Sequence, residues 1–197
     1  MKYHPPLQNF FREQTEKPQC PRLCFQIPLP PEPYLPGLSP PPSRHPLEPW
    51  SGEFQQNLLG HFPNPALCKR NLIYLFGIDL YHNGFFWEAH EAWEKIWRQV
   101  KSHPVTGSCL KGLIQHTAAL LKIKVKNLQG AQSLSRKAIS YFQIVLAVYP
   151  PAWKNPILGI HLPLWIKSLT TFYLPLWNQL IPLSPGHPPL IKLYSEN

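Results

Sequence analysis

The sequence predicts an all-α protein: a compact bundle of two packed antiparallel helical hairpins, with a further C-terminal helix and a proline-rich N-terminal arm. The first observation is the placement of the 26 prolines. Sixteen precede Ala66, one (Pro104) lies between Ala66 and Tyr149, and nine follow. Because proline disrupts helix interiors, long helices are expected in the proline-poor centre. There, apolar residues recur at spacings of three and four, which is the period of an amphipathic helix.

Four helices are expected in this centre and one after it. Asn83-Gly84 ends the first helix, because glycine tolerates the left-handed conformation that follows a helix. Pro163 suits the first turn of the last helix, and Pro175 is expected to end it. The expected helices are 65–82, 85–100, one that follows a turn at 104–107, 131–148, and one from the stretch 159–173.

The short turns predict antiparallel hairpins packed on each other. In the first pair, Tyr81, Gly84, Ala89 and Trp93 have the spacing of a tetratricopeptide-like hairpin, whereas the second pair fits less well. The arm is expected either to wrap the bundle or to be disordered, and the last ten residues to form an extended tail along it. The predicted division is a proline-rich arm at 1–64, a four-helix core at 65–149, and a C-terminal helix and tail at 150–197.

Composition argues against a secreted or membrane-spanning protein. The first residues lack the apolar region and cleavage site of a signal peptide. The most apolar late stretch is interrupted by Pro175 and Pro182 and carries Lys167 and Asn178. A membrane span needs roughly 20 continuous apolar residues. We therefore expect a cytoplasmic protein without a membrane span.

Cysteine content and charge indicate reduced thiols and a basic surface. The four cysteines are scattered, and Cys20 and Cys24 would form only half of a zinc site. The net charge is +9, with basic clusters at 122–126 and 136–137. No nucleic-acid-binding motif accompanies these clusters. A solvated basic face is the first interpretation, and nucleic-acid binding through the basic half is a weaker alternative.

The candidate site lies in the stretch G-F-F-W-E-A-H-E-A-W-E-K-I-W, which begins at Gly84. Four of the ten acidic residues fall between Asp79 and Glu94, and none occurs from Lys95 to Ser195. On a helical wheel, His90 lies within the apolar face and Glu94 at its margin. Glu91 lies further round, and Glu88 is predicted to point to water.

The motif H-E-x-x-E is similar to the H-E-x-x-H of zinc peptidases, but it lacks the second histidine. A catalytic zinc needs three protein ligands, so a further ligand would come from another element. In the alternative, the stretch is a buried polar cluster in which His90 hydrogen-bonds Glu94 or Gln115. Both interpretations stay open. The candidates for the further ligand are Asp79, His82 and His116.

Three motifs, in order and at similar spacing, resemble the domain of unknown function 309 family, which comprises small all-α prokaryotic proteins. They are G-I-D-L at 77–80, E-A-H-E-x-W-E-x-x-W at 88–97, and G-L-I-Q-x-x-A-A at 112–119. Members have sometimes been labelled predicted metal-dependent hydrolases. The family motif falls here on Asp79, Glu88, His90, Glu91, Glu94, Trp97 and Gln115. Pro41 and His161 replace a histidine and an acid, which weakens the implied metal site.

These observations predict a binding or scaffold module with a polar groove around His90, Glu94 and Gln115, open to a peptide, protein or small ligand. The alternative is a metal-dependent hydrolase in which His90, Glu91 and Glu94 are catalytic and His90 and Glu94 bind a divalent metal. No particular cofactor, partner or oligomeric state is predicted. The further candidate binding residues are Asp79, Glu88, Trp97, Lys111 and Gln115.

Overall fold

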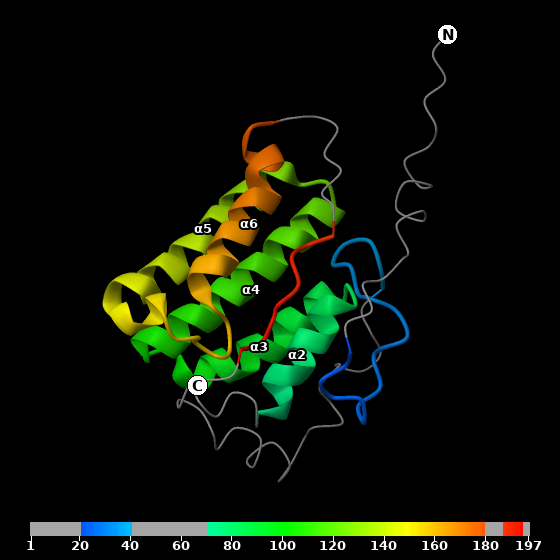
Figure 1. The fold of residues 1–197 in the computed structure, drawn as a ribbon. Helices are drawn as coiled ribbons and strands as arrows, with labels where there is room; N and C mark the ends of the chain where they lie inside the picture. The colour runs from blue at the N-terminus through cyan, green and yellow to red at the C-terminus, as the bar shows by residue number, and fades with distance from the viewer. Residues whose placement is uncertain (1–20, 41–70, 180–186, 195–197) are drawn as a thin grey trace.

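The computed structural model describes residues 21–40, 71–179 and 187–194. Within these residues the chain forms five α-helices and one short 3-10 helix (Figure 1), which confirms the predicted all-α fold. Expectations for 1–20, 41–70, 180–186 and 195–197 lie outside the described residues. The elements are α2 (Leu72–His82), α3 (Phe86–Val100), α4 (Pro104–Lys124), α5 (Leu128–Val148), η3 (Pro150–Trp153) and α6 (Leu162–Trp177).

Three helices begin at a side chain that caps them. Asn71 Oδ1 accepts the Tyr74 N–H, His103 Nδ1 accepts the Thr106 N–H, and Asn127 Oδ1 accepts the Gly130 N–H. Such a side chain satisfies an N–H that has no partner inside the helix. The prediction that Asn71 lies inside a helix from residue 65 was therefore wrong, as was the start at residue 131 for α5.

Two prolines also occupy other places than expected. Pro104 opens α4 itself instead of forming a turn at 104–107. This position suits proline, because the first helical N–H has no intrahelical partner. Pro175 lies inside α6, which continues to Trp177. Since Pro175 is exposed and only two residues from the end, it removes one hydrogen bond where the helix is about to end anyway.

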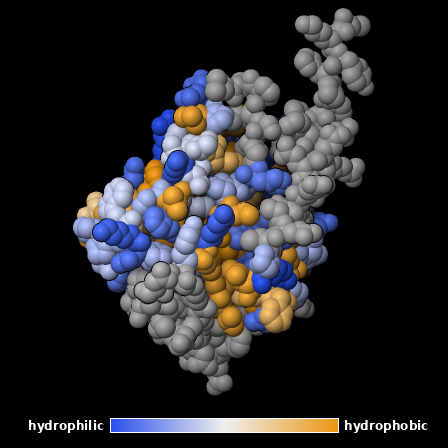
Figure 2. All heavy atoms as spheres, viewed as in Figure 1, coloured by the Kyte–Doolittle hydropathy of each residue, from blue (hydrophilic) through white to orange (hydrophobic). Residues whose placement is uncertain are grey.

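The helices pack in chain order. α2 lies against α3, α3 against α4 and α4 against α5, while α6 lies along α5 (Figure 1). The turn between α2 and α3 contains Gly84 at φ +83°, as the sequence predicted. α2 is buried nearly all round, and Figure 2 shows apolar residues gathered near it, whereas apolar residues are scattered among hydrophilic ones over α5 and α6.

A close contact between α2 and α3 fixes the first hairpin. Trp93 is fully buried, and its indole Nε1–H donates to the Tyr74 carbonyl at 3.3 Å. The ring lies directly against Gly77, where an added Cβ would be 2.3 Å from Trp93 Nε1. The hairpin therefore depends on the absence of a side chain at Gly77.

A chain of buried hydrogen bonds crosses the bundle at His116. Burial lowers the pKa of His116 to about 3, so the ring is neutral. The Tyr81 hydroxyl donates to the Pro189 carbonyl at 2.7 Å and therefore accepts from His116 Nε2 at 2.9 Å. His116 Nδ1 then accepts from the Tyr173 hydroxyl at 2.7 Å. The chain links α2, α4, α6 and the C-terminal segment.

The C-terminal segment 187–194 is extended and lies along the helices. Its Ile191 is buried, and the Ile191 N–H donates to His82 Nε2 at 3.0 Å. The Tyr194 N–H donates to the Gly159 carbonyl at 2.7 Å. Among the helices of the described ranges, none has the length and apolar character needed to cross a membrane.

Substitution of Gly77 by Ala is expected to destabilise the protein by about 1–3 kcal/mol, because the new methyl group overlaps the Trp93 indole. Urea unfolding measures this change. The double variant Gly77→Ala/Trp93→Phe should lose less stability than the sum of the losses in the two single variants, since the smaller ring leaves room for the methyl group. Strict additivity would contradict a direct clash.

Candidate functional site

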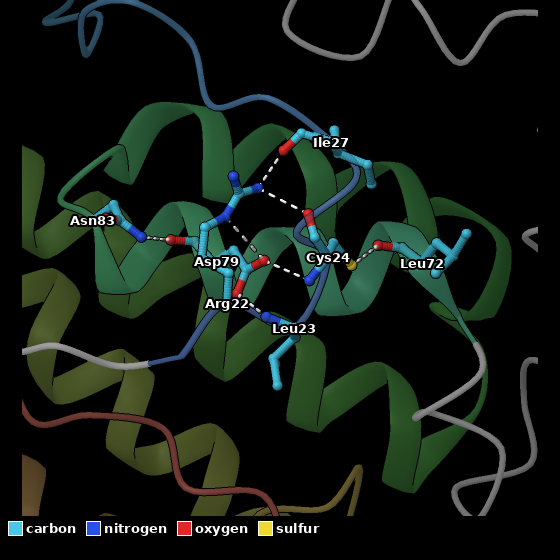
Figure 3. Close-up of polar contacts among 7 residues, drawn as sticks. All are labelled: Arg22, Leu23, Cys24, Ile27, Leu72, Asp79 and Asn83. Carbon is cyan, nitrogen blue, oxygen red and sulfur yellow. Dashed lines mark hydrogen bonds and ion pairs between the residues drawn. The ribbon is translucent and has the colours of Figure 1, made fainter.

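Asp79 holds the N-terminal arm against α2 (Figure 3). Its carboxylate is only 1% exposed and accepts two consecutive main-chain N–H groups, from Leu23 to Oδ1 and from Cys24 to Oδ2, each at 2.8 Å. Arg22 Nε lies 3.6 Å from Oδ2. A buried carboxylate needs such partners, because desolvating an unpaired charge is costly. This sequence-predicted binding residue therefore binds the chain's own arm.

Arg22 also fixes the turn of the arm that Asp79 binds. Its guanidinium donates to the carbonyl of Cys24 at 2.9 Å and to that of Ile27. The Cys24 thiol is buried against the Leu72 carbonyl, with Sγ at 3.7 Å. Burial first, and the Asp79 charge second, raise the pKa of this thiol to about 12. Cys24 is therefore a protonated structural thiol, and Cys24 and Cys109 are both free.

Glu88 is buried, which contradicts the prediction that it points to water. It is 3% exposed, and its Oε1 accepts the Tyr34 N–H at 2.8 Å. The Tyr34 ring meets Trp87 edge-to-face at a centroid distance of 4.8 Å. The wheel considered α3 alone, whereas the arm covers the face that the wheel left to solvent. Glu88 is thus a second attachment point for the arm.

Lys124 of α4 is a partly buried cation whose charge acts on Glu88. Its Nζ donates to the Gly84 carbonyl at 3.1 Å and lies 4.7 Å from the centroid of the Phe86 ring. Burial raises the pKa of Glu88, while the Tyr34 N–H and Lys124 lower it. Burial likewise lowers the pKa of Lys124, and Glu88 raises it. Each charge therefore stabilises the other beneath the arm.

His90, Glu91 and Glu94 come together on α3. One nitrogen or oxygen ligand atom from each lies within 4.8 Å of the others, and all three side chains are partly buried. His90 Nδ1 is 3.2 Å from the Ile114 carbonyl, so Nδ1 donates and Nε2 is left with the lone pair in the neutral ring. The expected hydrogen bond from His90 to Glu94 or Gln115 was wrong. Glu94 instead pairs with Arg98 at 3.0 Å.

The candidates for a further ligand do not join this group. Asp79 is occupied by the arm, and His82 Nε2 accepts the Ile191 N–H. His116 is fully buried between two tyrosine hydroxyls. All three carry out structural roles that the sequence gives no means to foresee, since their partners lie far away in the chain.

Two other predicted binding residues bind each other. Lys111 Nζ lies 4.0 Å from the centroid of the Trp97 ring, a cation–π contact between α4 and α3. Gln115 is half-buried on α4. Of the three residues around which the sequence predicted a groove, His90 lines the hollow described next, and Glu94 and Gln115 do not.

A hollow of about 150 Å³ lies between α3 and α4 and reaches the arm at Pro36. Most of its lining is apolar, with His90 and Glu91 on α3 and Lys122 on α4 as the polar members. Sequence reasoning missed most of this lining. A signal was present, because Ala118, Leu121 and Lys122 of α4 and its C-cap residue Val125 follow one another at spacings of three, one and three, which is one helix face. The lining residues are Pro36, Trp87, His90, Glu91, Ala118, Leu121, Lys122 and Val125.

Replacing Asp79 by Asn is expected to release the arm. The amide keeps one acceptor, but it turns its NH₂ toward a main-chain N–H and loses the ion pair with Arg22, which costs about 1–3 kcal/mol or more. Trypsin cleavage after Arg22 should then accelerate at least about fivefold. Glu32→Gln changes an exposed arm residue and serves as the control. Equal cleavage rates for the two variants would show that Asp79 does not hold the arm.

Comparison with known proteins found a family whose model matches the part of the chain that carries the candidate residues of α2, α3 and α4. Residues 74–134 match the model of a family described as Domain of unknown function (DUF309). No curated protein and no solved structure matches the chain. The matched segment begins in α2 and ends in α5, and it contains both arm-binding acids and the His90, Glu91 and Glu94 group. Over this segment, the chain resembles the DUF309 family.

Proposed function

We propose that the chain is a cytoplasmic binding module that holds a ring-sized apolar group in the hollow between α3 and α4. The observation that supports this most directly is the hollow itself, with its apolar wall and its few polar groups at one side. This combination is typical of sites for small ligands, although here the volume is small. An apolar cavity of about 150 Å³ is large enough for a benzene-sized group.

The lining indicates the chemistry of the ligand. Trp87, Leu121 and Val125 provide apolar contact, so the body of the ligand is an aromatic or branched aliphatic group. His90 Nε2 accepts a hydrogen bond when the ring is neutral, because Nδ1 donates to Ile114. A peptide side chain or a small molecule that carries a hydroxyl or N–H group beside its ring would satisfy both features.

The arm completes this site. Pro36 lines the hollow, and the arm that carries it is attached two residues earlier, where the Tyr34 N–H binds Glu88. Tyr34 also packs on Trp87, which is itself part of the wall. Binding in the hollow and docking of the arm are therefore coupled in this proposal.

Filling the hollow tests the proposal. Small aromatic probes such as phenol and indole are expected to shift the NMR signals of Trp87, His90 and Leu121. In Ala118→Trp these shifts should disappear, because the new indole occupies the hollow. Ala147→Trp introduces the same group on an exposed position of α5 and should bind the probes like the unaltered protein. Unchanged binding in Ala118→Trp would exclude the hollow as the site.

A metal-dependent hydrolase is the second candidate, favoured by the grouping of His90, Glu91 and Glu94. For three atoms 4.8 Å apart, the common centre is about 2.8 Å from each, so small side-chain rotations would reach zinc-ligand distances of about 2.0–2.2 Å. A metal-binding histidine commonly donates its other N–H to a carbonyl, as His90 Nδ1 does to Ile114. The residues therefore fit an ion, which when bound would activate water.

The hydrolase candidate requires one divalent ion per chain, held at least about tenfold more weakly in His90→Ala. Titration with Zn²⁺ and Mn²⁺ in a calorimeter measures this, and hydrolysis of p-nitrophenyl phosphate and p-nitrophenyl acetate provides a separate readout. His187→Ala removes an exposed histidine and is the control. Equal metal affinity in the two variants, or metal binding without hydrolysis of either ester, would contradict the hydrolase candidate and favour the binding module.

A further inference from the structure

The end of α5 and the 3-10 helix η3 expose an apolar surface. Ile144 is 44% exposed, Val148 53%, Tyr149 42% and Trp153 58%. We call these four residues the α5–η3 corner. They are adjacent, since Val148 follows Ile144 by one helical turn and the Ala152 N–H donates to the Tyr149 carbonyl. Isolated exposed apolar residues are ordinary, but a contiguous group that includes Trp and Tyr marks an interaction surface.

The helical register of α5 shows that this surface is separate from the core. Ala138, Phe142 and Val145 are buried and lie on one side of the helix. At 100° per residue, Ile144 lies about 160° and Val148 about 120° from the centre of the full set of buried α5 residues, so both project outward. The bundle therefore does not need these side chains for its own packing, because α5 already has a complete inner face.

Basic side chains surround the corner. Lys137 shares the outer face of α5 with Ile144, and Lys154 follows Trp153 directly; both are exposed. On α6, which also packs on η3, Leu164 is 50% exposed and Lys167 is exposed one turn later. No acidic residue occurs between Lys95 and Ser195, so no carboxylate of α4, α5, η3 or α6 offsets this charge.

We propose that the α5–η3 corner docks on the surface of an anionic lipid bilayer. Trp and Tyr favour the boundary between headgroups and acyl chains, where Trp153 and Tyr149 would lie. Ile144 and Val148 would enter the same layer, while Lys137 and Lys154 contact anionic headgroups. A second copy fits less well, because a symmetric contact would oppose the same lysines across the axis. This docking is independent of the ligand proposed between α3 and α4.

Sedimentation with lipid vesicles tests this proposal on the full chain. Binding is expected to vesicles of equal parts phosphatidylcholine and phosphatidylglycerol, but not to phosphatidylcholine alone. Trp153→Ala combined with Val148→Ser should weaken binding at least about fivefold, since both apolar contacts are removed. Phe25→Ala removes an aromatic residue that is 81% exposed on the arm, and it should leave binding unchanged.

A charge-matched pair separates docking from the general attraction of a basic protein. Lys154→Glu and Lys126→Glu change the net charge equally, but Lys126 lies at the other end of α5, in the turn after α4. Lys154→Glu is expected to reduce binding about tenfold and Lys126→Glu much less. Equal losses, or binding to neutral vesicles alone, would overturn the proposal. So would a dimer that Trp153→Ala dissociates in the absence of any vesicle binding.

Discussion

The carboxylate of Asp79 is the contact on which the rest of the site depends. A buried acid on a helix that is itself almost fully buried is unfavourable unless hydrogen bonds replace its water. Two main-chain N–H groups of the arm, from Leu23 and Cys24, do this. The arm has no helix or strand of its own in the stretch 21–40, so its course is set by what it binds. Asp79 sets where that course begins.

Glu88 of α3 binds the arm in the same way at Tyr34, which follows Leu23 by eleven residues. It accepts the Tyr34 N–H on one side and interacts with Lys124 of α4 on the other. Glu88 thereby joins the arm to α3, and the charge of Lys124 on α4 acts on it, next to the hollow to which Pro36 contributes. Four acids that are close in sequence thus divide by role. Asp79 and Glu88 face the arm, whereas Glu91 and Glu94 stand beside His90 on the more open side.

The helices could be predicted from the sequence because each one repeats its apolar residues at a period that a single segment displays. Their ends were harder, since Asn71 and Asn127 could be read as helical residues or as caps until their side-chain contacts were known. Glu88 shows the deeper reason for failure. Its exposure depends on Tyr34, 54 residues away, and a helical wheel contains no such partner. The hydrogen bond from His90 to the Ile114 carbonyl was hidden for the same reason, because main-chain acceptors leave no mark in the sequence.

The two candidate functions compete for one atom. With Nδ1 committed to the Ile114 carbonyl, His90 has a single lone pair at Nε2. That lone pair either accepts a hydrogen bond from a ligand in the hollow or coordinates an ion with Glu91 and Glu94, and it cannot do both at once. An ion would therefore compete with any ligand that hydrogen-bonds His90. A ligand held only by Trp87, Leu121 and Val125 would not meet this competition, since these residues offer no metal ligand. In both proposals the chemistry of the site thus depends on Nε2 of His90, and the docked arm supplies Pro36 to the wall around it.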